Sequence, residues 1–163
     1  MSVIFYSSDQ ETNRLSILAP VEGVSAEQLA AQMLPVGTQY CIADSPLSFG
    51  VRHDYFSAYR FVDGQVTADL GEVKSIHVEK LREARVPLFA ALDTAYFKAL
   101  ESGDTSKMQN ISAAKQALRD LPDQPLPPTA EEVMDFWPTI LTQDPEVLAN
   151  DPTAISASAP TVS

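Results

Sequence analysis

The strongest constraint in this sequence is a pair of apolar stripes at helical spacing. Apolar side chains recur at steps of three and four in residues 73–99 and again in residues 108–121, which places each set on one face of an α-helix. Gly103 lies between them and predicts a short turn, so the two helices should form an αα-hairpin. Neither helix can bury its stripe alone, and each therefore needs the other helix or a partner chain. The stripes comprise Val73, Ile76, Leu81, Ala84, Leu88, Ala91, Leu92, Ala95 and Ala99, and then Met108, Ile111, Ala114, Lys115, Leu118 and Leu121.

Pro87 lies inside the first stripe. Proline removes a backbone N–H and pushes against the carbonyl of the residue one turn earlier, which here is Glu83. We therefore expect a kink at this position, or a break into two helices.

Residues 1–70 predict a small unit of mixed α and β structure. Residues 3–6, 14–18 and 39–43 are rich in strand formers. Ser25 and Gln28 have the spacing of a capping box, so a helix of up to about three turns should begin there. Asp63-Gly64, between residues 59–62 and 65–70, predicts a tight β-hairpin.

The last part of the sequence is rich in proline and acid. Residues 122–163 hold eight of the 12 prolines, and the run at 125–128 should be extended. Thr129 is a candidate N-cap for a short helix over residues 130–136. From about residue 150 the sequence is of low complexity and is expected to be disordered when alone. The fold class is therefore predicted as α+β in three parts: a small α/β unit (1–70), an αα-hairpin (71–121) and an acidic, proline-rich C-terminal arm (122–163).

The net charge of −11 is unevenly distributed. Residues 1–72 carry a net −6 and residues 73–120 a net +2, whereas residues 121–163 hold seven acids and no Lys or Arg. Affinity for nucleic acid comes from clustered cations, so we expect no nucleic-acid partner. The acidic segment is either a docking element for a basic surface or a solvating tail that limits aggregation.

The sequence also predicts no membrane partner and no secretory signal. Its apolar runs are far shorter than the ~18–20 residues of a membrane span, and residues 1–6 lack the basic region of a signal peptide. Cys41 is the only cysteine, which leaves no internal disulfide and no cysteine-built zinc site. Because it falls in an apolar run, we expect a packed thiol rather than a nucleophile.

The common catalytic and cofactor motifs are missing from the sequence. There is no Gly-rich phosphate loop, no G-x-S-x-G and no H-E-x-x-H. Neither His53 nor His77 has a second ligand at zinc-site spacing, and His77 is expected at the flank or in the core of its helix. Sequence order does not exclude a Ser/His/Asp triad assembled in space, but no motif indicates one. We therefore expect no enzymatic activity, no cofactor and no metal site.

Two groups of residues are candidates for partner binding. Arg82 and Arg85 either form surface pairs with nearby Glu residues or contact an acidic partner subunit. Val133, Phe136 and Trp137 have the spacing to fill an apolar groove on a partner. Trp137 has an alternative, which is to pack back on the chain's own helices.

Five aromatic residues are crowded into a stretch of thirteen positions before the hairpin. They predict either a core that joins the β unit to the long helix or an exposed contact patch. These residues are Phe49, Tyr55, Phe56, Tyr59 and Phe61.

Several short pieces, in a fixed order, resemble a family of small proteins of tailed bacteriophages, described as tail proteins or tail-fibre assembly chaperones. The aromatic-rich strand pair comes first, and the basic helix I-H-x-x-x-[IL]-R-x-x-R follows. An L-D step, a Gly-Asp break, a closing L-R-D-x-P and Phe-Trp-Pro complete the series. The matching residues are Ile76, His77, Leu81, Arg82, Arg85, Leu92, Asp93, Gly103, Asp104, Leu118, Arg119, Asp120, Pro122 and residues 136–138. The resemblance covers residues 54–141, and the Trp that precedes the basic helix in the tail chaperones is missing here.

The resemblance implies a non-enzymatic role through protein–protein contacts. The expected function is a minor structural subunit of the virion tail or tail-fibre region, and the alternative is an assembly chaperone that is not retained in the virion. Partners would be other phage tail or fibre proteins, with an oligomer possible. The expected location is the virion tail or the cytoplasm of the infected host.

Overall fold

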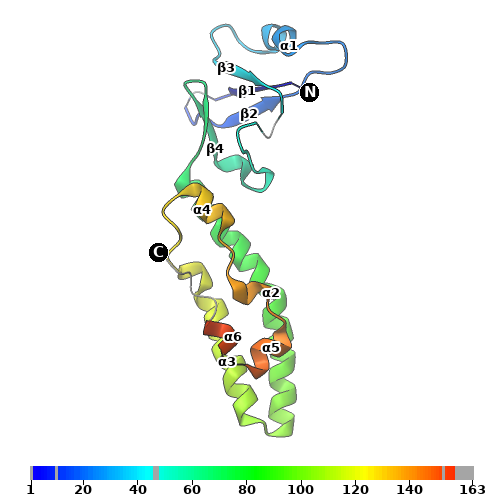
Figure 1. Ribbon diagram of the computed structural model, residues 1–163, viewed down its shortest axis with the longest axis vertical. Helices are drawn as coiled ribbons and strands as arrows, with labels where there is room; N and C mark the ends of the chain where they lie inside the picture. The colour runs from blue at the N-terminus through cyan, green and yellow to red at the C-terminus, as the bar shows by residue number, and fades with distance from the viewer. Residues whose placement is uncertain (1, 10, 46–47, 152, 157–163) are drawn as a thin grey trace. The chain divides into compact units, whose positions relative to one another are not determined.

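The computed structural model describes residues 2–9, 11–45, 48–151 and 153–156. Mixed α and β structure, with small sheets and several helices, confirms the predicted fold class at this coarse level (Figure 1). The chain divides into two compact units, Met1–Val73 and Lys74–Ser163. Among the described residues, no helix combines the length and the apolar character needed to cross a membrane.

The first unit is built on a three-stranded antiparallel sheet. Strand β1 (Val3–Ser7) lies between β2 (Leu15–Leu18) and β3 (Tyr40–Ala43), so all three predicted strands form. Helix α1 (Ala26–Met33) packs its buried Ala26 and Ala30 against Ile4 of β1. The predicted capping box starts this helix. The backbone N–H of Gln28 donates to Ser25 Oγ at 3.2 Å, and Ser25 N–H donates to Gln28 Oε1 at 3.0 Å.

The predicted hairpin forms β4 (Tyr59–Val62) and β5 (Gln65–Ala68). Asp63 and Gly64 have φ of 51° and 78°, the left-handed pair that a two-residue turn of type I′ requires. A 3₁₀ segment, η1 (His53–Ala58), precedes the hairpin. Of the five crowded aromatics, Tyr55, Tyr59 and Phe61 are buried, whereas Phe49 is 37% exposed and sits edge-on to Phe5.

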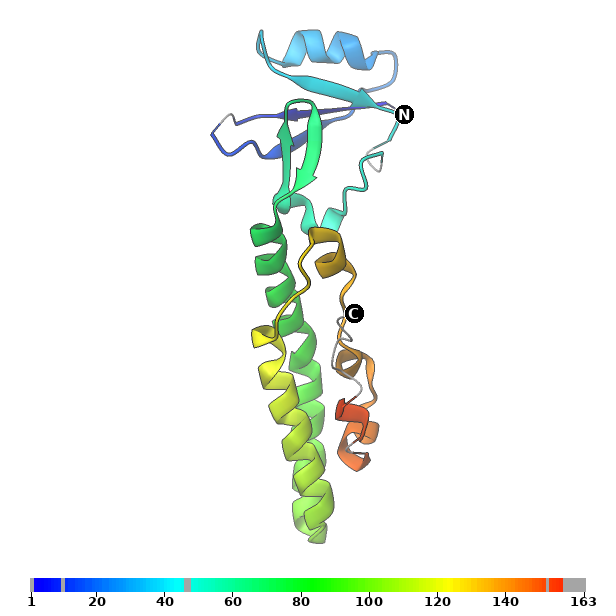
Figure 2. The ribbon, with the colours of Figure 1, turned by 60° about the vertical axis from the view of Figure 1, so that its left-hand side comes forward.

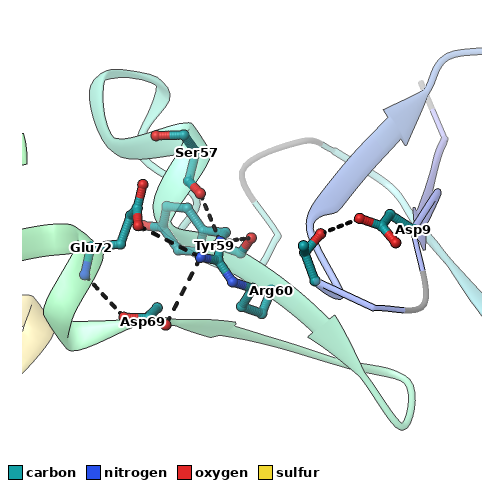
Figure 3. A network of polar contacts seen from close by, with 7 residues as sticks. Asp9, Ser57, Tyr59, Arg60, Asp69 and Glu72 are labelled. Carbon is teal, nitrogen blue, oxygen red and sulfur yellow. Dashed lines mark hydrogen bonds and ion pairs between the residues drawn. The ribbon is translucent and has the colours of Figure 1, made fainter.

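Arg60 ties the hairpin to the start of the long helix (Figure 3). Its Nη1 donates to the carbonyl oxygen of Ser57 at 2.7 Å, and its Nη2 lies 3.9 Å from Asp69 Oδ2 and 3.9 Å from Glu72 Oε2. Asp69 also accepts from the backbone N–H of Glu72 at 3.0 Å, which caps the helix that follows. One cation therefore neutralises two acids at a helix N-terminus.

Two long helices, α2 (Leu70–Ser102) and α3 (Thr105–Asp120), lie side by side in both views (Figures 1 and 2). Gly103 has φ +69° in the turn, and Asp104 caps α3 through a bond from Lys107 N–H at 2.9 Å. The predicted stripes meet in one buried cluster. Its members from the two helices are Leu88, Leu92, Ala99, Ile111, Ala114 and Leu118.

Of the two outcomes expected at Pro87, a kink or a break, the break does not occur: α2 is one helix from Leu70 to Ser102. Pro87 is exposed, so its missing N–H lies on the solvent side of the helix. Leu81 and Leu92, on either side of it, are fully buried. We attribute the continuity of α2 to this burial, which offsets the local cost of the proline.

Residues 121–151 and 153–156 belong to the second unit and contain short helices, among them the helix predicted after Thr129, whereas residues 125–127 lie in no helix or strand. Ile140 and Leu148 are fully buried in the same cluster as α2 and α3. The disorder expected from about residue 150 falls partly on residues 152 and 157–163, which lie outside the described residues. The elements are η2 (Leu121–Asp123), α4 (Ala130–Asp135), η3 (Thr139–Thr142), α5 (Pro145–Asn150) and α6 (Thr153–Ser156).

Leu88→Ala and Leu118→Ala should each destabilise the chain by about 2–5 kcal/mol, because each removes a buried side chain from the shared cluster. Urea unfolding of the two variants measures this cost. Leu100→Ala is the matched control, since Leu100 of α2 is 54% exposed and should change stability by less than about 0.5 kcal/mol. Equal midpoints in all three variants would contradict the packing described here.

Candidate functional site

The sole tryptophan packs on a buried histidine. The ring of Trp137 meets His77 of α2 edge-on, at a centroid distance of 6.2 Å and an interplanar angle of 88°. Phe136 lies beside the same imidazole at 6.0 Å. His77 is fully buried, as expected for a core histidine, whereas Trp137 remains 45% exposed. Part of the indole is therefore held by the chain's own helix, and the rest is open to a partner.

The local sequence explains why α4 ends just before Trp137. Thr129 and Glu132 form a capping box that starts α4. Val133 is fully buried on α4, which orients the helix. The helix ends at Phe136, whose N–H donates to the carbonyl of Glu132 at 2.9 Å, and Pro138 prevents its continuation. Trp137 is thus displayed at a fixed helix end.

The segment that carries this tryptophan is acidic. All seven acids between residues 121 and 156 are exposed, and that part of the chain has no Lys or Arg. Glu132, Asp144 and Asp151 are also engaged in helix caps or in the turn before α6, and the bonds from Thr153 hold the pKa of Asp151 below its ordinary value. Asp123, Glu131 and Glu146 each lie in the first turn of a short helix.

The sequence-predicted partner residues are not brought together in one patch. Val133 is buried within the chain, so it offers no surface to a groove. Arg82 forms an exposed pair with Glu79 one turn earlier. Arg85 instead donates from Nη1 to the carbonyl oxygens of Leu118 and Arg119, each at 3.0 Å, which satisfies the C-terminal end of α3.

Two features of this region were missed by sequence reasoning. His77 was assigned to the core, but its contact with Trp137 joins residues sixty positions apart and no local pattern indicates it. The second feature is a group of cations over aromatic rings: Arg85 and Arg119 both lie 5.9 Å from the centroid of Phe89, and Lys115 lies 6.0 Å from that of Tyr96. The spacing of Arg85 and Phe89, four residues apart on one helix, was the available signal.

The described residues contain no group of three or more His, Cys, Asp or Glu side chains placed to hold a metal ion. A pocket of about 500 Å³ lies between α2 and α5 and is lined by small side chains together with Lys98, Asp104, Lys107, Asp144 and Glu146. Burial raises the pKa of the Cys41 thiol, which disfavours the nucleophilic thiolate.

Arg85→Gln should destabilise the chain by about 1–2 kcal/mol, because it removes a charged donor from two carbonyls at the end of α3. Arg82→Gln is the matched control on the same helix. It loses only an exposed pair and should cost less than about 0.5 kcal/mol. The two unfolding midpoints, measured side by side, should therefore differ. A larger cost for Arg82→Gln would contradict these assignments.

Comparisons with protein-family models, with curated proteins and with solved structures found no match to this chain. The resemblance to tailed-phage proteins therefore depends on the order of its motifs, and it stays a prediction.

Proposed function

We propose that this chain is a non-enzymatic, tail-associated bacteriophage protein that acts through protein–protein contacts as a minor structural subunit of the virion. In this proposal the α2–α3 hairpin is the rigid support and the segment from Pro122 to Leu141 is the contact arm. The partners are other tail or fibre proteins. The motif order shared with small tail proteins suggests the particle, and the surface around Trp137 suggests the mode of contact.

The half-exposed Trp137 is the observation that carries the proposal. Tryptophan is the side chain most enriched among residues that dominate binding energy, and such residues lie in sites that lose water on binding. Here His77 and Phe136 hold one side of the indole before any partner arrives, which reduces the ordering cost of association. Glu131, Glu132 and Asp135, which shortly precede the indole in the sequence and are exposed, favour a partner with basic groups at the rim of its apolar pocket.

Trp137→Ala should lower incorporation of the chain into particles at least about tenfold, because truncating a central aromatic anchor typically costs 2 kcal/mol or more. The experiment compares wild type and variant by quantitative mass spectrometry of purified particles made from the genome that encodes the chain. Val147→Ala is the matched control, since Val147 is also exposed on the acidic segment but lies away from the indole cluster.

The same measurement separates structural subunit from assembly chaperone. A structural subunit is present in the purified particles at a reproducible copy number. If the wild-type chain is required for assembly but missing from finished particles, the chaperone function is supported and the proposal of a structural subunit fails. If the Trp137→Ala variant is incorporated into particles as well as wild type, Trp137 is not part of the contact.

A further inference from the structure

The three-stranded sheet of the first unit ends in an open edge at β3. This strand pairs with β1 on one side, and no other strand among the described residues pairs with its second side. The opposite edge of the sheet is met by β4, because Phe61 N–H donates to the carbonyl of Asn13 at 2.8 Å and Arg14 forms a β-bridge with Arg60. Alternate residues of an edge strand direct their N–H and C=O groups away from the sheet. The β3 edge therefore offers backbone hydrogen bonds to a further strand.

The sequence of β3 does little to prevent such pairing. Exposed sheet edges are usually protected by Lys, Pro or a β-bulge. Residues 36–43 contain no proline and no charged residue, and β3 pairs with β1 in a regular register without a bulge. The strand is short, at four residues, so side chains must contribute to any contact made there.

Two apolar side chains of β3 are exposed on the face of the sheet that α1 covers elsewhere. Ile42 lies opposite Ile4 of β1, so both side chains point to the same face. Tyr40, two residues away along β3, points there as well. Helix α1 packs on this face against Ile4 and Leu18, but it leaves Tyr40 44% and Ile42 36% exposed. A strand added at the edge would cover this apolar surface as well as the backbone.

The edge matches a second copy of itself. Residues that face each other in antiparallel strands point to the same side of the sheet, so a two-fold axis normal to the sheet must pass through a pair of identical residues. An axis at Cys41 places Tyr40 of each copy opposite Ile42 of the other, and such aromatic and β-branched pairs stabilise sheets. An axis at Ile42 would instead place Tyr40 opposite Asp44. Because residues 36–43 are uncharged, two chains of net charge −11 meet there without like charges facing each other.

We propose that the β3 edges of two copies pair antiparallel about a two-fold axis at Cys41 and join the two sheets into one. This goes beyond the proposed function, because it concerns self-association of the first unit and does not use the Trp137 contact with another tail protein. The same surface is used by both copies, so association closes at the dimer. A four-residue edge with two exposed apolar side chains buries less than the ~800 Å² per partner of a standard complex, so the dimer should be weak and reversible.

A lysine on β3 tests the edge. Ile42→Lys places an ammonium group where Tyr40 of the second copy would pack. Val21→Lys is the matched control, since it makes the same change of charge at a residue that is 71% exposed in the loop before α1, outside β3. Circular dichroism of each full-length variant checks that it folds. In sedimentation velocity over a range of concentrations, wild type and Val21→Lys should form a dimer and no larger species, whereas Ile42→Lys should dimerise about tenfold or more weakly.

Cys41 tests the register in the unmodified chain, because it is the only cysteine. At the two-fold axis the two Cys41 side chains face each other, and a short bismaleimide can join them without the strict geometry of a disulfide. Burial raises the pKa of this thiol, so cross-linking by chance collision should be slow. Cys41→Ser with Ser16→Cys is the matched control, since it moves the single thiol to a partly buried position on β2. The control should be cross-linked at least about tenfold more slowly than wild type, because its thiols gain no effective concentration.

Three outcomes would overturn the proposal. Wild type could remain monomeric at every concentration and be cross-linked no faster than the Ser16→Cys control, which would leave the edge to an extended segment of a different protein. The folded Ile42→Lys variant could dimerise as wild type does, which would place the contact elsewhere. Finally, wild type and Ile42→Lys could both grow beyond a dimer, which would indicate a contact that does not close.

Discussion

The second unit depends on the burial of two apolar helix stripes that neither helix could cover alone. Leu88 and Leu92 of α2 meet Ile111 and Leu118 of α3, and all four are buried in one cluster. This contact keeps α2 continuous through Pro87 and gives the C-terminal segment a surface on which Ile140 and Leu148 are buried. The position of Trp137 on the surface follows from that packing.

Elements with local causes could be predicted from the sequence. The capping boxes at Ser25 and Thr129 depend on residues three apart, and the turn at Asp63-Gly64 depends on two adjacent ones. Each encodes its own hydrogen bonds or backbone conformation, so reading the sequence was sufficient. The apolar periodicity of α3 likewise predicted its buried residues because helical geometry is regular.

Features with non-local causes could not be predicted in this way. The proline rule suggested a kink or a break at Pro87; α2 does not break there, and we attribute this to the burial of Leu81 and Leu92 on either side. The proline-rich run at 125–128 was expected to be extended, but it gives no sign that Ile140 and Leu148 beyond it are buried against the helices. Arg85 was expected either to pair with nearby Glu residues or to contact an acidic partner, yet it donates to carbonyls more than thirty residues away. In each case the deciding partner is distant in the sequence.

The contact site combines both kinds of information. Phe136-Trp137-Pro138 could be identified as an anchor from its residue types, but the support given by His77 appears only in the fold. Because His77 supports the indole, the site is already formed before binding, unlike a flexible peptide that becomes ordered only on binding. The distinction matters because a held indole loses less freedom on association.

Fluorescence quenching of the single tryptophan tests this account most directly. With acrylamide as the quencher, Trp137 of the isolated full-length chain should show partial accessibility, between that of the unfolded chain in urea and full protection, and it should become protected in assembled particles. Full protection in the isolated chain would make Trp137 internal packing and would contradict a contact site. Accessibility equal to that of the unfolded chain would contradict the support by His77.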